Sequence, residues 1–280
     1  MTLEVIDVGG LTTVQDRGRL GYAHLGVPRA GAMDAPAAAL ANRLVGNPAD
    51  AAVLEVTLGG LRLRLTSSRW IAVTGAPGPL GIGGRSGAIE RAEWLRAGVT
   101  MTLGTPTSGV RSYVAVAGGI GVEPVLGSRS ADVLAGLGPP PLRAGDTLPL
   151  LPGLGAPVPL DTPPRRVLDG LGVHAGPRPE WFSPDTLARL CSRTWTVLPA
   201  SNRVGLRLTG DPLPRLEGEL ASEGMVLGAI QVPPDGRPVV FLNDHPTTGG
   251  YPVVGVVDPA DLWQCAQLRP GEKVSFRRPR

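Results

Sequence analysis

The sequence predicts a mostly β protein with a few short helices. Glycine and proline together make up a quarter of the 280 residues, and both favour the turns that join short strands over long helices. An apolar content of 42% and a net charge of only +3 indicate a chain that buries a sizeable core and does not remain disordered. Alternation of apolar and polar residues is frequent, whereas helical periodicity is confined to three short stretches.

The clearest strand signal lies in the first quarter of the chain. Segments 53–58 and 61–65 alternate in polarity and are separated by Gly59 and Gly60. A Gly-Gly pair between two such segments is a strong signal for a two-residue β-hairpin. In that hairpin Glu55 would face Arg64 across the ladder, as opposite charges often do.

Three helices are expected, each indicated by a capping residue. The first begins at Asp34, the second follows Ser183 and the third follows Asp258; in the second and third the next residue is proline, which is favoured at helix starts. Cys191 and Cys265 fall on the apolar faces of the second and third helices. Both cysteines are therefore interpreted as small core residues.

A repeated phrase and a proline-rich stretch indicate two β-rich units. The phrase Leu-Arg-Ala/Pro-Gly places a glycine at a turn just before an alternating strand, and a proline-rich stretch is unsuited to a helix interior or a central strand. The phrase occupies residues 95–98, 142–145 and 268–271. We expect a first unit over 1–150, a linker over 151–165 and a second unit over 166–280.

Several protein classes are excluded. The sequence has no long apolar run and no secretory signal, so we expect a cytoplasmic protein with no membrane association. Cys191 and Cys265 are too few for a disulfide framework, and the three histidines are too dispersed for metal-ligand spacing, so no metal site is expected. Arginines are scattered and aromatics make up only 4%, which argues against nucleic-acid binding.

Nucleotide-binding loops are also missing. Lys273 is the only lysine, so the chain contains no GxxxxGK[ST] phosphate-binding loop. The glycines of segment 81–87 miss the GxGxxG pattern, and a hairpin turn is predicted there.

Three polar, glycine-rich stretches each leave two interpretations open. Around residues 12–34, backbone amides with Arg17 and Arg19 hold an anion, or the stretch is an ordered loop in which Asp34 only caps a helix. In the second stretch, residues 125–130, Arg129 binds a carboxylate or phosphate, or lies in a solvated turn. In the third, residues 201–205, Arg203 faces a ligand or forms a buried ion pair.

A fourth stretch has the densest set of polar residues. A turn at 234–236 is expected to bring the strand that carries Gln231 next to the strand that leads to Asp244. Asp244 and His245 would supply an acid/base pair, and Thr247 and Thr248 hydroxyl donors. The alternative is a hydrogen-bonded loop that binds no ligand.

These stretches together resemble one known family. The chain is identified as a member of the allophanate hydrolase subunit 2 family, also called the biotin-dependent carboxyltransferase family, which includes the C-type subunit of 5-oxoprolinase. The matching motifs run in order through nearly the whole chain. They are TTVQDRGR at 12–19, GVP at 26–28, GAMD at 31–34, AVAGGI at 115–120, LGSRS at 126–130, SNR at 201–203, GAIQVPPDG at 228–236 and TTGGYP at 247–252.

The resemblance implies a fold, partners and two chemistries. It implies two cyclophilin-like β-barrel units and a smaller partner, subunit 1. In urea carboxylase the fused equivalent of both subunits transfers a carboxyl group from carboxybiotin to urea. In 5-oxoprolinase the pair acts with a third subunit and ATP to open 5-oxoproline to glutamate.

Two positions depart from the family pattern. Ala30 replaces a common serine, which removes a hydroxyl from the first stretch. His245 stands where many members carry arginine, which weakens the transfer of an anion-binding role to that position.

We therefore expect a subunit of an ATP-dependent 5-oxoprolinase-type complex, an amidohydrolase active only with its subunit 1 homologue and a third subunit, acting on a small amide. The alternatives are a carboxyltransferase component that uses carboxybiotin from another protein, since this chain has no biotin-type lysine, and a non-enzymatic regulatory binder of the partner subunit. Asp244, Arg203 and Gln231 are the expected catalytic residues. The expected substrate-binding residues are Thr247, Thr248, Tyr251, Asn202, Arg129 and Asp34.

Overall fold

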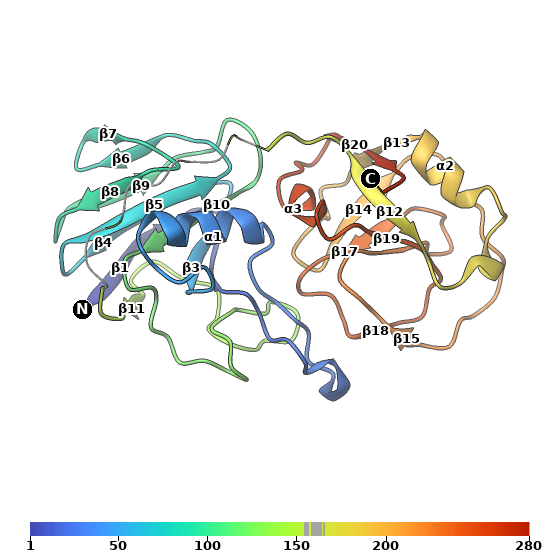
Figure 1. Ribbon diagram of the computed structural model, residues 1–280, viewed down its shortest axis with the longest axis horizontal. Helices are drawn as coiled ribbons and strands as arrows, with labels where there is room; N and C mark the ends of the chain where they lie inside the picture. The colour runs from blue at the N-terminus through green and yellow to red at the C-terminus, as the bar shows by residue number, and fades with distance from the viewer. Residues whose placement is uncertain (154–156, 158–163, 165, 280) are drawn as a thin grey trace. The chain divides into compact units, whose positions relative to one another are not determined.

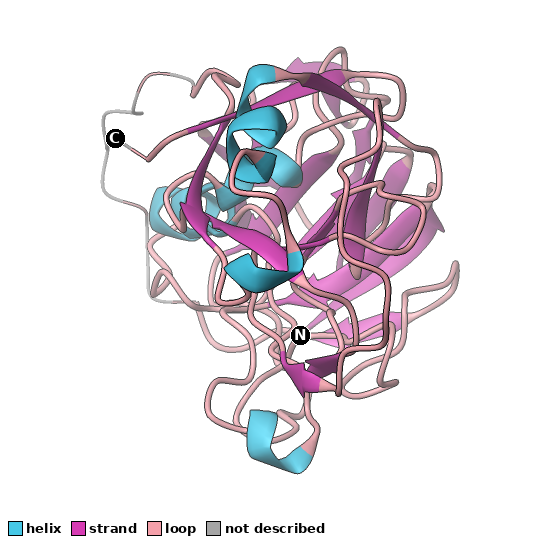
Figure 2. Cartoon of the chain, turned by 90° about the vertical axis from the view of Figure 1, so that its right-hand side faces the viewer, coloured by secondary structure: helices cyan, strands magenta, loops and turns pink. Residues whose placement is uncertain are grey.

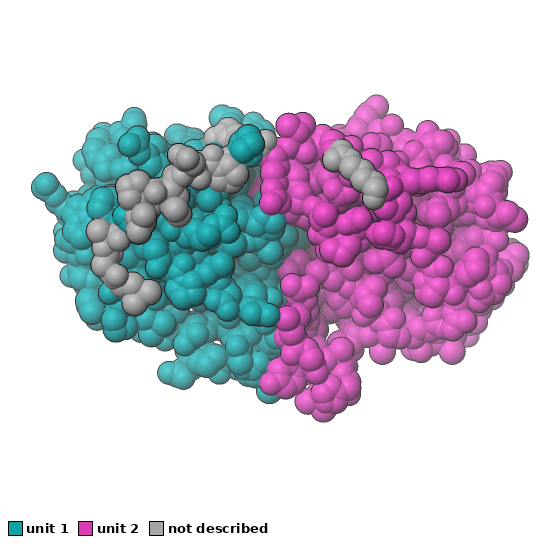
Figure 3. All heavy atoms as spheres, viewed as in Figure 1, with its two compact units in different colours: residues 1–19, 30–165 teal, residues 20–29, 166–280 magenta. Residues whose placement is uncertain are grey.

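The computed structural model is mostly β, which confirms the predicted fold class (Figure 2). It describes residues 1–153, 157, 164 and 166–279. The predicted linker 151–165 therefore lies largely outside the described residues. The chain divides into two compact units (Figure 3): unit 1 comprises residues 1–19 and 30–165, and unit 2 comprises residues 20–29 and 166–280.

Unit 1 contains two antiparallel sheets, one of six strands and one of five (Figure 1). In spatial order the first sheet consists of β11 (Thr147–Pro149), β1 (Thr2–Val8), β4 (Leu61–Leu65), β9 (Thr100–Leu103), β6 (Leu80–Ile82) and β7 (Arg85–Gly87). The second consists of β2 (Leu11–Gln15), β3 (Val53–Thr57), β10 (Arg111–Val116), β5 (Arg69–Gly75) and β8 (Ala92–Leu95).

The main core of unit 1 is shared by both sheets. Leu63 and Met101 of the six-stranded sheet belong to the same buried cluster as Ile71 and Val114 of the five-stranded sheet. Alternate residues of β10 contribute to a second cluster, in which Tyr113 packs with residues of a helix. β10 is therefore covered on both faces, which explains why all six of its residues are buried, and it is the central strand of its sheet.

The first helix, α1 (Ala35–Leu44), forms where it was predicted. The Asp34 side chain accepts a hydrogen bond from the Ala37 amide, as an N-cap does. Ala38, Ala41 and Leu44 lie on the buried face, and α1 contacts β10 and β5 of the five-stranded sheet (Figure 1).

The predicted hairpin at Gly59-Gly60 is wrong. β3 pairs with β2 and β10, whereas β4 pairs with β1 and β9 in the other sheet. Glu55 accordingly lies opposite Tyr113, and Arg64 forms an ion pair with Glu4 instead. Both glycines have positive φ, and they carry the chain from one sheet to the other without closing a hairpin within a sheet.

Other glycine turns agree with the sequence. β6 and β7 form the hairpin expected in segment 81–87. Gly98, Gly145 and Gly271, the glycines of the repeated phrase, all have positive φ, and each lies shortly before a strand, respectively β9, β11 and β20 (Lys273–Arg277).

Unit 2 is built around a closed seven-stranded barrel. Neighbouring strands are antiparallel except β12 and β20, whose parallel pairing joins Leu171 to Phe276 and closes the barrel. In order around the barrel the strands are β12 (Leu171–Ala175), β19 (Val253–Val257), β16 (Ala229–Gln231), β17 (Val239–Phe241), β14 (Gly205–Thr209), β13 (Thr194–Val197) and β20. A separate two-stranded ribbon pairs β15 (Glu223–Gly224) with β18 (Thr248–Gly249).

The remaining helices are short and begin later than predicted. α2 (Thr186–Ser192) starts three residues after Ser183, and α3 (Leu262–Cys265) starts four residues after Asp258. In both cases the expected capping residue lies in the preceding turn: Ser183 contacts Asp185, and Asp258 accepts from the Ala260 amide. Single-turn helices η1 (Ala23–Leu25) and η2 (Pro179–Trp181) complete the helical elements described.

The close backbone contact at Gly59, where the chain crosses between the two sheets of unit 1, predicts how alanine substitution there changes the free energy of unfolding. A Cβ added at Gly59 would lie 2.1 Å from the Gly104 carbonyl oxygen, whereas one added at Gly98 meets nothing within 4 Å. Both glycines have similar positive φ, +70° and +74°, so replacement by alanine carries a similar backbone penalty of about 1 kcal/mol. Gly59→Ala adds a clash, and we expect it to lower the free energy of unfolding by over 1 kcal/mol more than Gly98→Ala, on the order expected for strain. Denaturant unfolding measures this difference, and equal losses would contradict the crossover geometry.

Candidate functional site

Asp16 organises the loops of unit 1 by joining two of the polar sequence motifs. Its Oδ1 accepts hydrogen bonds from the Ser128 and Ser130 hydroxyls, both at 2.6 Å, and from the Gly18 amide at 2.8 Å. Its Oδ2 accepts from the Arg129 amide at 2.6 Å. One carboxylate therefore fixes segments more than a hundred residues apart, because it accepts bonds that neither segment satisfies alone.

The arginines of these motifs have structural contacts. Arg19 is buried and donates to the carbonyl oxygens of Val125 and Ser130. Arg129 donates from Nε to the Val122 carbonyl at 2.8 Å. Arg17 is exposed and lies 3.7 Å from Asp50. Of the two interpretations of this stretch, the contacts of Arg19 favour an ordered loop.

A second polar cluster in unit 1 surrounds Glu55. Glu55 Oε2 accepts from the Met33 amide and the Tyr113 hydroxyl, both at 2.9 Å, while Tyr113 Oη accepts from the Asp34 amide at 2.7 Å. Burial, together with the nearby Glu55 and Asp34 carboxylates, raises the pKa of the Tyr113 phenol well above its ordinary value. Tyr113 is therefore a hydrogen-bond donor to Glu55 at neutral pH, and Asp34 caps α1 beside it.

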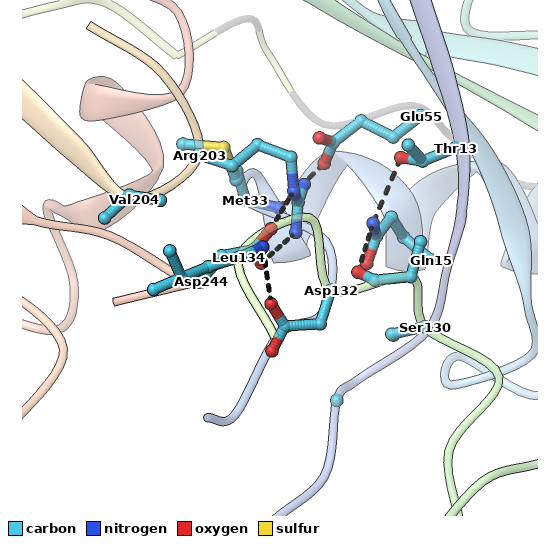
Figure 4. A network of polar contacts seen from close by, with 12 residues as sticks. Thr13, Gln15, Met33, Glu55, Ser130, Asp132, Leu134, Arg203, Val204 and Asp244 are labelled. Carbon is cyan, nitrogen blue, oxygen red and sulfur yellow. Dashed lines mark hydrogen bonds and ion pairs between the residues drawn. The ribbon is translucent and has the colours of Figure 1, made fainter. Parts of the chain in front are cut away.

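The central feature of the unit 2 barrel is a buried ion pair. Arg203 Nε and Nη2 donate to Asp244 Oδ2 and Oδ1 at 2.9 and 2.8 Å (Figure 4). The side chains are only 2% and 0% exposed. Such a two-point arrangement fixes the plane of the guanidinium as well as its position. The ion pair, one of the two sequence interpretations of Arg203, is present in the structure, and a role of Arg203 toward a ligand stays a prediction.

The topology explains why these two residues meet. Arg203 comes just before β14 and Asp244 just after β17, and these strands pair with Gly205 opposite Phe241. The two side chains therefore emerge at the same end of neighbouring strands. The Asp244 amide also donates to the Arg203 carbonyl at 3.1 Å, so backbone and side chains join the same two loops.

Gln231 belongs to a different part of the barrel. As predicted, its strand β16 lies beside β17, but Gln231 is opposite Val239, where β17 begins. Its Nε2 donates to the Tyr251 carbonyl at 3.0 Å and contacts the Met225 sulfur at 3.3 Å. The register thus places Gln231 and Arg203 toward opposite ends of β17.

The remaining polar residues of these motifs in unit 2 have contacts mainly with the backbone. Thr248 is exposed on β18, and the Thr247 carbonyl accepts from the Met225 amide. Asn202 is exposed, and its Oδ1 accepts from the Val204 amide at 2.8 Å. His245 is buried and its Nδ1 lies 2.7 Å from the Pro246 carbonyl. A carbonyl only accepts, so Nδ1 carries a proton.

Metal sites and membrane spans both bear on function. Over the described residues, no group of three or more His, Cys, Asp or Glu side chains is placed to bind a metal ion. None of the helices within that same part of the chain is both long and apolar enough to cross a bilayer.

Comparison with known proteins identifies the family. Residues 25–278 match the model "Carboxyltransferase domain, subdomain A and B". The chain belongs to this carboxyltransferase domain family.

Among curated relatives, the C-type 5-oxoprolinase subunit of Escherichia coli is 39% identical over 98% of this chain and 90% of its own length. Urea amidolyase of Lachancea kluyveri is 34% identical over 98% of this chain, which spans only 17% of that protein.

Solved structures agree with this assignment. The structure of TTHA0988 matches with a TM-score of 0.90 and 39% identity over 99% of this chain and 55% of that one. The K. lactis urea amidolyase matches with a TM-score of 0.92 and 30% identity over all of this chain and 19% of that one. The chain therefore corresponds to nearly the whole of the E. coli 5-oxoprolinase subunit but to a fraction of the other three proteins.

Sequence reasoning missed the tertiary partners of the motifs it found. It selected Arg129 as a ligand contact but did not connect its loop to Asp16. It placed Glu55 opposite Arg64 and so missed Tyr113. The polar residues of the two loops that Asp16 joins could be found in the sequence, but nothing in a single sequence specifies which loop contacts which.

The Asp16 arrangement predicts an unusually sensitive carboxylate. Both oxygens of the Asp16 carboxylate accept hydrogen bonds in the wild type. In Asp16→Asn the side-chain NH₂ group replaces one of these oxygens in either orientation of the amide, and it then faces a donor that it cannot accept from. We expect a loss of about 1.5–3 kcal/mol in the free energy of unfolding. Asp7→Asn is the matched control, because exposed Asp7 accepts a single amide bond at 3.2 Å, and it should change stability by less than about 0.5 kcal/mol. Equal, small effects in denaturant titrations would show that Asp16 does not hold the loops.

Proposed function

We propose that this chain is a subunit of an ATP-dependent complex that opens 5-oxoproline to glutamate. The single observation that supports this proposal most strongly is the match to the C-type 5-oxoprolinase subunit of E. coli along 98% of this chain and 90% of that protein. A subunit 1 homologue and a third subunit would act with it, and ATP would be consumed by the complex.

The ion pair of unit 2 supplies a role for the chain in that reaction. An amide is opened when its carbonyl oxygen is activated by phosphorylation or carboxylation, and negative charge develops around that oxygen. A guanidinium already oriented by Asp244 stabilises such charge without further reorganisation. Arg203 is therefore proposed to stabilise the activated amide, with Asp244 holding it in position.

Gln231 and its neighbours are proposed to bind the substrate. The Gln231 amide is fixed by the Tyr251 carbonyl, and Thr247 and Thr248 lie in the same connection between β17 and β19. Side-chain amides and hydroxyls offer both donors and acceptors to a small polar ligand. Asn202 is a further proposed substrate contact in unit 2, whereas Arg129 and Asp34 of unit 1 stay predictions from the sequence.

Carboxyl transfer is the second candidate, favoured by the family match and by the similarity to urea amidolyase. In that case the chain would accept carboxybiotin carried by another protein. Lys273, the only lysine, lies on barrel strand β20, so we propose that this chain carries no covalent biotin.

Reconstitution distinguishes the two candidates. The chain would be co-expressed with its subunit 1 homologue, supplied with the third subunit, and assayed for ATP-dependent glutamate release from 5-oxoproline. Turnover that requires this chain and is insensitive to avidin supports the 5-oxoprolinase function. Absence of turnover with 5-oxoproline, together with avidin-sensitive carboxylation of urea, would replace it by carboxyl transfer.

The role of Arg203 is tested by a conservative variant. Removing the guanidinium altogether would break a buried ion pair, at a cost of about 3–5 kcal/mol, so alanine would confound activity with folding. Arg203→Lys keeps the charge but cannot form the two parallel bonds. We expect kcat of the complex to fall at least about tenfold.

The matched control is Arg207→Lys, an exposed arginine two residues into β14, which should leave kcat unchanged. Thermal unfolding of both variants shows whether each remains folded at the assay temperature. A folded Arg203→Lys protein with the kcat of the control would remove Arg203 from the reaction.

A further inference from the structure

Gln231, which is proposed to bind the substrate, is almost completely covered. It is the last residue of β16, and it is only 3% exposed. A side chain that binds a ligand has to be reachable, so a part of the structure that covers Gln231 must move before a substrate can contact it. The groups that contact the Gln231 amide therefore determine how such a site opens.

The β15–β18 ribbon supplies these contacts. The ribbon lies outside the barrel strands (Figure 1). Met225 directly follows β15, and its amide donates to the Thr247 carbonyl at 2.9 Å, which extends the ribbon by one residue. Gln231 Nε2 donates to the Met225 sulfur at 3.3 Å and to the Tyr251 carbonyl at 3.0 Å. Both partners of the amide nitrogen therefore belong to segments that extend or follow the ribbon.

Gly249 of β18 permits this close approach. A Cβ placed at Gly249 would lie 2.5 Å from Gln231 Nε2 and 3.0 Å from Met225 Sδ. On the opposite strand of the ribbon, a Cβ placed at Gly224 meets nothing within 4 Å. Neither glycine has a positive φ. The close contact with Gln231, and not the backbone conformation, therefore requires a glycine at position 249.

The ribbon is held to the barrel by weak contacts. Each of its strands has two residues, and an isolated two-stranded ribbon is marginally stable at best. Glu223 of the ribbon forms an ion pair with Arg178, but both side chains are partly exposed, and such pairs contribute little. Met225 adds an apolar contact with Ala229 and Val253 of the barrel. The ribbon can therefore lift while the barrel stays folded.

The contact between Gln231 and Met225 is one that a substrate can replace. A thioether sulfur is a weak hydrogen-bond acceptor, whereas carbonyl and carboxylate oxygens are strong ones. The Pro252 carbonyl accepts from the Val232 amide at 3.1 Å, so the neighbouring Tyr251 carbonyl is held beside the barrel. Lifting of the ribbon would thus release one N–H bond of the amide and leave the other in place.

We propose that Met225 and Gly249 are positioning residues for Gln231, and that the ribbon which carries them is a strap that lifts to admit the substrate. Without substrate, the Met225 sulfur occupies the N–H bond of Gln231 that an oxygen of the substrate takes on binding. This inference rests on the proposed function only for the role of Gln231 as a substrate contact.

Hydrogen exchange tests the strap without an assay of activity. In the full chain, labelled with ¹⁵N at glutamine, exchange of the Gln231 side-chain amide with water is compared with that of Gln15. Gln15 is 0% exposed and donates to the Ala131 carbonyl, also at 3.0 Å, but it lies outside the ribbon. Lifting of the strap should make exchange at Gln231 at least about tenfold faster than at Gln15. Equal rates would overturn the strap.

The part played by Met225 is tested in the same measurement. Met225→Leu keeps most of the apolar volume but removes the sulfur acceptor, so exchange at Gln231 should become faster while exchange at Gln15 stays the same. An unchanged rate at Gln231 in this variant would remove Met225 from the positioning role.

Gly249→Ala tests the positioning role during turnover. Its added methyl group displaces the Gln231 amide, so we expect KM of the reconstituted complex for 5-oxoproline to rise at least about tenfold with little change in kcat. Gly224→Ala, in the open strand of the same ribbon, is the matched control and should change neither constant. A variant that is merely less folded would show a lower kcat at unchanged KM, and that result would overturn the positioning role.

A double-mutant cycle shows whether Gly249 acts through Gln231. In Gln231→Ala the amide that the added methyl group would meet is absent, so Gly249→Ala in that background should change KM by less than about twofold. A tenfold effect in both backgrounds would overturn the proposal. If the complex does not turn over 5-oxoproline, the proposed function fails, whereas the exchange rates of Gln231 and Gln15 still decide whether the ribbon is a strap.

Discussion

The buried pair of Arg203 and Asp244 is the interaction on which the proposed site in unit 2 depends. Two opposite charges have been removed almost completely from water, and such a pair is retained only when its geometry satisfies both partners. The barrel supplies that geometry, because β14 and β17 are neighbours and their adjoining loops emerge at one end. The same desolvation that makes the pair costly also strengthens the field that the guanidinium exerts on a nearby oxygen.

Unit 1 also depends on a carboxylate that satisfies polar groups. There Asp16 accepts hydrogen bonds from loop residues that are not paired in a sheet. Loops rich in glycine have many amides and hydroxyls that no strand partner satisfies. Asp16 collects four of these donors and so orders a region with little regular secondary structure.

Local features of the fold could be predicted from the sequence, and nonlocal ones could not. The capping of α1 by Asp34, the hairpin at 81–87 and the glycine turns before β9, β11 and β20 depend on neighbouring residues alone. The hairpin at Gly59-Gly60 failed because the choice between pairing within a sheet and crossing to another depends on Gly9, Gly104 and other distant backbone. Local alternation in β3 and β4 is compatible with both outcomes.

The site shows the same division. The motifs that carry Arg203, Asp244 and Gln231 were found from their polarity, but 41 residues separate the ion pair, and only the barrel register brings its members together. The same register places Gln231 and Arg203 toward opposite ends of β17. The turn at 234–236, from which the sequence analysis expected them to converge, does not determine that register.

The central claim is that the complex activates the oxygen of an amide, and the fate of that oxygen tests it most directly. The reconstituted complex would be given ATP and 5-oxoproline that carries a heavy-oxygen label in its ring carbonyl. If that oxygen attacks the terminal phosphorus, later cleavage of its bond to carbon releases it with phosphate, so one labelled oxygen should appear in phosphate for each glutamate formed. Label that remains entirely in glutamate would contradict phosphorylation of the amide oxygen.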